Sequence, residues 1–153
     1  MPATAASTGR QWEYEVKEDK MTGAPTRYAW TSSTNTHEFG FPYQGSQHAT
    51  LALRRGGRFG KDVIPRIERG QLMERSCEDS TALIRFDDGK PERFCIGGVS
   101  SGTSEVAFIQ GYERFVQKLR KAKTIRIAME FYQHGSPIWE FDVSWFDYER
   151  HSK

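Results

Sequence analysis

One short segment has the residue pattern of a serine nucleophile. Gly98, Ser100 and Gly102 match G-x-S-x-G, which in serine hydrolases presents a reactive hydroxyl on a tight turn between a strand and a helix. Asp142 and His151 follow in the order that completes such a triad. The parallel sheet that a nucleophile elbow needs is not predicted here, and the sequence has no second glycine-rich loop for an oxyanion hole. We therefore predict a plain strand-to-helix connector at Ser100 and assign no catalytic residue.

The histidines do not follow a metal-binding pattern. No pair among His37, His48, His134 and His151 has the i, i+4 or H-x-H spacing, and no cysteine or acidic cluster stands beside them. The sequence therefore predicts no metal site and no cofactor.

The two cysteines, Cys77 and Cys95, flank a predicted hairpin. If the turn centres near residues 88–89, Cys95 lies opposite residue 82 and not directly opposite Cys77. A disulfide remains open if the chain before Ser80 folds back, and two buried free thiols are the alternative.

Two stretches are rich in basic residues. Residues 54–75 carry an excess of four positive charges, and residues 113–126 carry an excess of five. If they converge they could bind an anionic surface; otherwise they are solvated faces of strands and a helix. The candidate binding residues are Arg54, Arg55, Arg58, Lys118, Lys121 and Lys123, together with Phe41 and Tyr43 of an aromatic loop that either contacts a partner or packs inward.

The composition predicts one soluble domain. The 153 residues carry a net charge of +2, with 27% charged and 13% aromatic side chains. This charge balance disfavours nucleic-acid binding, and no apolar run is long enough to span a membrane. The first ten residues lack the apolar segment of a signal peptide, so we expect either a cytoplasmic protein or a mature chain whose signal was removed.

Alternating apolar residues predict a succession of strands, since side chains of a strand point to opposite faces in turn. The clearest are 81–86 and 92–96, joined by an Asp-Gly turn, and the final pair 125–131 and 139–145 with an aromatic core face that includes Trp139, Phe141 and Trp145. Pro65 within 62–68 predicts an edge strand or a bulge. Further strands are expected at 12–17, 27–33, 37–41 and 48–54.

One amphipathic helix is predicted over residues 104–122. Its apolar stripe recurs every three or four residues, with Thr103 or Ser104 as N-cap and Gly111 in its interior. The stripe consists of Phe108, Ile109, Tyr112, Phe115, Val116 and Leu119.

Several segments resemble a known group of proteins. They are Trp12, 19–23, 51–54, 84–91, 108–110, Phe115, 119–123, 131–133, 135–137 and 140–144. Together they resemble a family of uncharacterised bacterial exported proteins and, more distantly, the TagO-like envelope proteins associated with type VI secretion. The resemblance spans about residues 12–146 and implies a periplasmic β-sandwich-like accessory or binding domain without catalytic residues.

These observations predict a mainly antiparallel β fold, as a sandwich or open barrel, with one amphipathic helix packed on the sheet. The domain is expected over residues 10–147, with a disordered lead at 1–9 and a frayed tail at 148–153. The first functional hypothesis is a non-enzymatic periplasmic domain that binds a protein or another component of the cell envelope. The alternatives are a cytoplasmic module that binds an acidic partner or nucleic acid through residues 54–75 and 113–126, and a serine hydrolase using Ser100.

Overall fold

The computed structural model describes residues 12–40, 43–56, 60–69, 81–98, 106–131 and 135–152. Within these ranges the chain forms one large sheet, a separate hairpin and two short helices. In spatial order the large sheet consists of β1 (Glu13–Glu18), β2 (Pro25–Ser32), β5 (Ala49–Gly56), β6 (Gly60–Ile67), β9 (Ala107–Ile109), β8 (Glu92–Gly98), β7 (Thr81–Phe86), β10 (Thr124–Ala128) and β11 (Ile138–Asp142). The separate hairpin is β3 (His37–Gly40) with β4 (Tyr43–Gln47), and the helices are α2 (Tyr112–Leu119) and α3 (Tyr148–Ser152).

Every strand pairing in these ranges is antiparallel. Most strands pair with a neighbour in sequence, and β2 pairs with β5 because the β3–β4 hairpin is inserted between them. The predicted mainly antiparallel β fold with an amphipathic helix on the sheet is confirmed.

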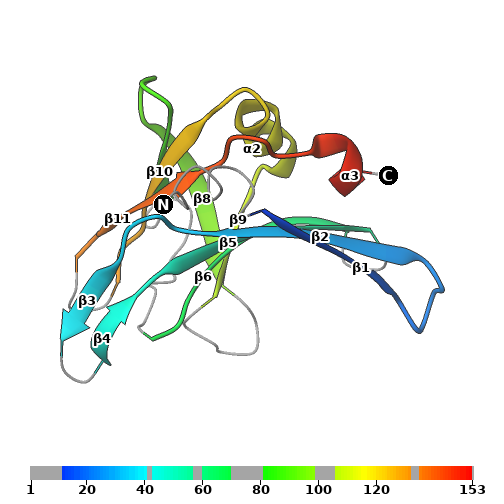
Figure 1. Cartoon of the computed structure of the whole chain (residues 1–153), viewed down its shortest axis with the longest axis horizontal. Helices are drawn as coiled ribbons and strands as arrows, with labels where there is room; N and C mark the ends of the chain where they lie inside the picture. The colour runs from blue at the N-terminus through cyan, green and yellow to red at the C-terminus, as the bar shows by residue number, and fades with distance from the viewer. Residues whose placement is uncertain are drawn as a thin grey trace, which may run out of the picture.

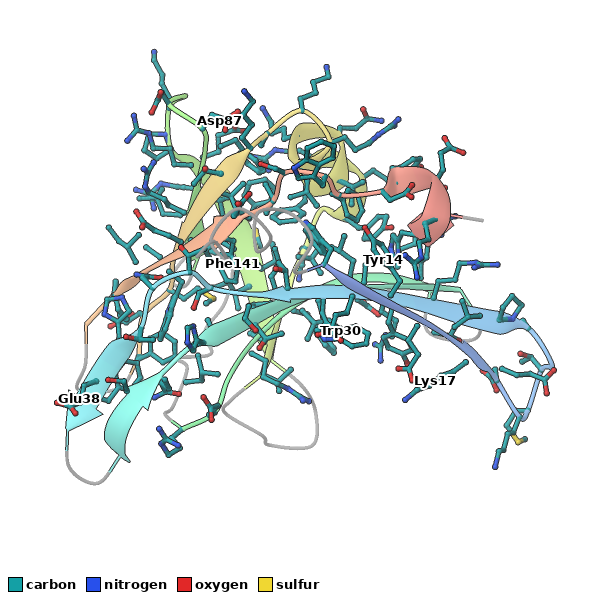
Figure 2. The ribbon with its side chains drawn as sticks, in the orientation of Figure 1. Tyr14, Lys17, Trp30, Glu38, Asp87 and Phe141 are labelled. Carbon is teal, nitrogen blue, oxygen red and sulfur yellow. The ribbon has the colours of Figure 1, made fainter. Side chains whose placement is uncertain are left out.

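The large sheet bends, so that its two halves enclose a shared core. In Figure 1, β2 and β5 run across the view, whereas β8 and β10 cross them at a steep angle. Helix α3 contacts β2 and α2 contacts β6, both on the core side of the first half. We call this side of β1, β2, β5 and β6 the inner face and the opposite side the outer face. Phe141 lies on the inner side of β2 and Trp30 on its outer side (Figure 2).

Period-two burial fills the core from both halves of the sheet. Leu51 and Leu53 of β5 are fully buried, and so are Ile125 and Ile127 of β10. These side chains belong to one cluster with Trp139 of β11, as the sequence predicts. Alternation along each strand therefore decides which residues remain for the outer face.

The connection from β2 to β3 occupies the free edge of β11. The Asn35 side chain donates from Nδ2 to the carbonyl oxygen of Ile138 at 2.9 Å and accepts the N–H of Glu140 at 2.8 Å. The Thr34 N–H donates to the carbonyl oxygen of Glu140 at 2.7 Å. A side-chain amide thus copies the hydrogen bonds of a neighbouring strand, and the sheet approaches a closed barrel at this end.

The helix predicted over residues 104–122 begins later than predicted. Residues Ala107–Ile109 form β9, which lies between β6 and β8. Gly111 precedes α2 with a φ of 88°, a left-handed conformation that ends one element and allows the next to begin. Phe108 and Ile109 therefore belong to the sheet and not to the first turn of the helix. The rest of the stripe is buried as predicted, at Tyr112, Phe115, Val116 and Leu119.

Pro65 lies in an interior strand, so the predicted edge position is wrong. Strand β6 is flanked by β5 on one side and β9 on the other. It pairs with β9 at Val63–Ile109 and then at an isolated bridge between Arg66 and Val106. Pro65 falls between these two contacts, and its missing N–H interrupts the ladder with the short β9 without ending the sheet.

Two predictions for the C-terminal segment are also wrong. Residues 148–152 form α3 instead of a frayed tail, and His151 is 1% exposed. Trp145 does not continue the core face of the last strand, because it is 76% exposed with a φ of 68°. The strand ends at Asp142, whose carboxylate accepts the Ser144 N–H at 3.0 Å in a turn.

Candidate ligand-binding site

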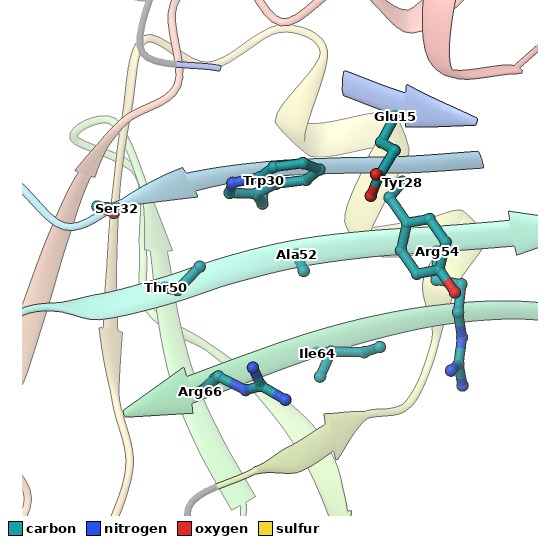
Figure 3. Close-up of a pocket in the computed structure, with 9 residues that line it drawn as sticks. All are labelled: Glu15, Tyr28, Trp30, Ser32, Thr50, Ala52, Arg54, Ile64 and Arg66. Atoms are coloured by element: carbon teal, nitrogen blue, oxygen red, sulfur yellow. The ribbon is translucent and has the colours of Figure 1, made fainter. Parts of the chain in front are cut away.

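A hollow opens on the outer face of β1, β2, β5 and β6 (Figure 3). Its volume is about 450 Å³, which lies within the range of small-molecule sites in proteins. The side chains that line it come from alternating positions of four strands, so the antiparallel register places them in rows across the sheet. They are Glu15, Tyr28, Trp30, Ser32, Thr50, Ala52, Arg54, Ile64 and Arg66.

The central row creates the depth of the hollow. Trp30, Ala52 and Ile64 lie opposite one another on β2, β5 and β6. Trp30 and Ile64 are half-buried, and the single methyl group of Ala52 leaves a low floor between them (Figure 3). A flat ring can therefore rest on apolar surface here, with the indole as its largest contact.

The row on one side of the centre is charged and fixed in position. Glu15, Tyr28, Arg54 and Asp62 lie opposite one another on the four strands. Arg54 donates from Nη2 and Nε to one oxygen of Asp62, at 2.7 and 3.0 Å. The two side chains are 17% and 21% exposed, so this charge-assisted pair is partly shielded from water. The pair holds Arg54 at the wall of the hollow with its charge balanced.

The row on the other side is polar. Ser32, Thr50 and Arg66 lie opposite one another on β2, β5 and β6. Within the described ranges the Arg66 guanidinium has no carboxylate partner, and its side chain extends beside Ile64 (Figure 3). This row therefore offers hydroxyl groups and a cation to the rim of a ligand whose face contacts the central row.

The basic stretches predicted as a binding surface are divided by the fold. Arg54 and Arg55 are adjacent on β5 and point to opposite faces, because alternation separates neighbouring side chains. The two stretches meet where the Lys61 ammonium lies 2.5 Å from the Glu113 carboxylate. Positive charge at this contact is therefore neutralised.

Lys118 of the second stretch is also held in an ion pair. Its ammonium lies 2.8 Å from the Glu92 carboxylate, which Arg114 approaches to 3.2 Å. The hydrogen bond from Lys118 lowers the pKa of Glu92 most; burial opposes it, and Arg114 adds to the lowering. Lys121 and Lys123 follow the helix and are exposed. Among the described residues neither of them forms an ion pair, so both remain available to contact a partner.

Three further predicted residues cannot be placed. Phe41, Arg58 and the side chain of Tyr43 lie outside the described residues. Their predicted contacts stay predictions.

The position of Ser100 relative to Asp142 and His151, the residues proposed for a hydrolase triad, is likewise not defined. Ser100 lies outside the described residues, and His151 Nε2 lies 3.1 Å from Tyr112 Oη in the interior. Burial, followed by the charges of Arg55 and Arg27, lowers the pKa of His151 from 6.5 to about 4. Burial also raises the pKa of Tyr112 to about 12, although Arg55 opposes this. The histidine is therefore neutral at physiological pH.

Cys95 is disulfide-bonded, while Cys77 lies outside the described residues. Cys95 pairs across the hairpin with Thr81, one residue from the predicted position.

Among the described residues no three histidine, cysteine or acidic side chains are grouped to hold a metal ion. Neither helix of this part of the chain is long and apolar enough to cross a membrane.

Sequence reasoning missed the residues of the outer hollow. Tyr28 and Trp30 are two residues apart in a predicted strand, and this spacing already places them on one face. The sequence does not indicate which face of this strand is buried. In the structure the small Ala29 and Thr31 lie in the core, and the large Trp30 faces outward. Hydrophobicity alone favours the opposite assignment.

The chain matches no family model and no curated protein. Among solved structures, invasion associated protein B from Bartonella henselae is similar to it, with a TM-score of 0.49 and 16% identity. The similarity covers 86% of this chain and 80% of that one. A likeness at this level says nothing about function.

Proposed function

We propose that this chain is a non-enzymatic binding domain of the bacterial cell envelope, and that its outer hollow binds saccharide units of an envelope polymer. The observation that carries the proposal is the row of Trp30, Ala52 and Ile64, an apolar floor with a half-buried indole, between two polar rows. A sugar ring has C–H groups on its faces and hydroxyl groups around its rim. It therefore matches an aromatic floor with polar side chains on either side.

The charges around the hollow favour a saccharide over a polyanion. Arg54 is paired with Asp62, and Glu15 supplies a negative charge on the same side. Arg66 supplies a positive charge at the opposite row. A nucleic-acid site depends on several unpaired cations that neutralise phosphates, and the charges that line this hollow are close to balanced.

Two observations support the envelope as the compartment. The sequence resembles bacterial exported proteins over most of its length, and Cys95 is disulfide-bonded. Disulfides persist in oxidising compartments such as the periplasm and are rare in the cytosol.

The test is affinity electrophoresis in gels that contain soluble polysaccharide fragments released from bacterial envelopes. We expect the wild-type chain to be retarded by at least one fragment. Trp30→Ala should weaken binding about 30-fold, as expected for an aromatic contact at the centre of a site. Circular dichroism of the variant verifies that the fold is retained.

Trp145→Ala is the matched control, because it removes an indole that is 76% exposed and lies outside the hollow. We expect its retardation to equal that of the wild type. Equal losses in both variants, or the absence of retardation by every fragment, would contradict the proposal.

A further inference from the structure

A second cluster of polar groups lies on the inner face, at the end of β2 and β5 near α3. Arg27 on β2 lies opposite Arg55 on β5, which lies opposite Lys61 on β6. Like charges in such a row repel one another. Arg150 of α3 and Arg27 also line one hollow of about 230 Å³. The fold therefore gathers cations from three strands and a helix.

One member of this row has a counter-charge. The Lys61 ammonium is 2.5 Å from the Glu113 carboxylate. Within the described ranges, Arg27, Arg55 and Arg150 form no ion pair with a carboxylate. Three guanidinium groups thus remain as hydrogen-bond donors without an anionic acceptor.

The carboxylates of this region are engaged elsewhere. Glu15 lines the same hollow as Arg27 and Arg150, but its carboxylate lies 3.7 Å from the Lys17 ammonium. Asp147 accepts the backbone N–H of Arg150 at 3.0 Å, which holds its side chain at the start of α3. The N–H donors of Arg27 and Arg150 are therefore open to an acceptor from solution.

A buried histidine lies near Arg55 and Arg27. Arg55 donates to Tyr112 Oη, and that hydroxyl lies 3.1 Å from His151 Nε2. When the Tyr112 hydroxyl donates to Nε2, the ring hydrogen lies on Nδ1. His151 is 1% exposed, and its Nδ1 has no partner in the described part of the chain. A buried donor without an acceptor is costly, so an acceptor at this position would stabilise the fold.

We propose that Arg27 and Arg150, with Arg55 next to Arg27 on the neighbouring strand, form a binding site for a small oxyanion of the phosphate class. This goes beyond the proposed saccharide function and uses a second hollow, beside β1, β2 and α3. A tetrahedral oxyanion offers several acceptor oxygens and a charge that offsets the repulsion between the arginines. The hollow of about 230 Å³ has room for such an ion.

The test is calorimetric titration of the full chain with inorganic phosphate, with ionic strength held constant by chloride. Arg27→Gln and Arg150→Gln should each weaken phosphate binding about tenfold, the effect of one lost charge-assisted hydrogen bond. Phosphate should also shift the imidazole resonances of His151 in the wild type. Tighter binding of glycerol 3-phosphate would support the same site and place the anion on a larger ligand.

Arg85→Gln is the matched control, since Arg85 contacts the Gly89 carbonyl in the turn between β7 and β8. Its phosphate affinity should equal that of the wild type. The proposal is overturned if phosphate does not bind, if all three variants bind it equally, or if the His151 resonances do not move at saturation. Circular dichroism verifies that Arg27→Gln and Arg150→Gln retain the fold, and the His151 resonances of the wild type give a readout that needs no variant.

Discussion

At the scale of single residues, burial changes the chemistry that sequence position suggests. His151 is third from the C-terminus, where side chains are commonly exposed, yet it packs between Tyr112 and Phe146 with ring distances of 6.5 and 6.0 Å. Its neutral form is favoured by burial and by nearby arginines. Protonation of this side chain is therefore linked to unfolding.

The stability of the chain should fall as the pH decreases from about 6.5 to about 4, in part through His151. The unfolded chain takes up this proton near pH 6.5 and the folded chain only near pH 4. Folding lowers the pKa of His151. The resulting loss of stability is therefore absent above about pH 6.5 and reaches about 1–3 kcal/mol near pH 4.

His151→Gln tests this expectation, because an amide oxygen can still accept from Tyr112 and does not titrate in this range. Free energies of unfolding in urea, measured for both proteins across the pH range, should converge toward low pH relative to their difference at neutral pH. Parallel curves for the two proteins would show that His151 does not contribute.

Gln47 is a second residue whose role the sequence does not reveal. It is 1% exposed, accepts the N–H groups of Glu68 and Arg69 at 3.0 and 2.9 Å, and donates to the Arg69 carbonyl at 2.6 Å. Glutamine is usually a surface residue. The Gln47 amide can be buried because backbone groups just after β6 supply its hydrogen-bond partners. Such pairings depend on tertiary contacts that a single sequence does not show.

At the scale of elements, the strong alternation predicts strands well and the helix only in part. The hairpin of β7 and β8 and that of β10 and β11 lie where the sequence predicts them. Strand β9 is missed because its three residues are too short to show a period, and their apolar side chains extend the pattern of the following helix. Gly111 lies at the boundary between β9 and α2, but the sequence alone does not show that this glycine has a positive φ.

Gly111→Ala should lower the free energy of unfolding by about 1–2 kcal/mol, the cost of placing an L-residue in a left-handed conformation. A Cβ at this position would lie 3.8 Å from Phe94 Cδ2, an ordinary contact, so the backbone is the cause. If Gly111 were inside a helix, the same change would raise stability by about 1 kcal/mol.

The sign of the change in urea unfolding therefore distinguishes the two structures. Gln117→Ala is the control within α2, since Gln117 is exposed and the change should alter stability by less than about 0.5 kcal/mol. A gain in stability for Gly111→Ala would contradict the boundary between β9 and α2.

At the scale of the whole molecule, bending of the sheet decides both the core and the outer hollow. The row of Glu15, Tyr28, Arg54 and Asp62 joins residues up to 47 positions apart on four strands. Period-two alternation predicts the members of each strand's two faces. It does not predict which strands become neighbours or which face turns outward, and the candidate site depends on both.

Asn35→Ala should weaken the closure between the β2–β3 connection and β11. It removes two hydrogen bonds to the edge of β11, at a cost of about 1–3 kcal/mol. Hydrogen exchange of the Glu140 amide should become faster, while the Ile84 amide inside the sheet keeps its rate relative to global unfolding. Unchanged exchange at Glu140 would show that Asn35 does not hold this edge.

The central claim is that ligand contacts the outer face around Trp30. The most direct measurement is the set of indole N–H resonances of the four tryptophans, recorded while a retarding polysaccharide fragment is added. The resonance of Trp30 should shift with saturation, and those of Trp12, Trp139 and Trp145 should remain in place. A shift confined to Trp145, or no shift at Trp30 under conditions in which the fragment is bound, would contradict the claim.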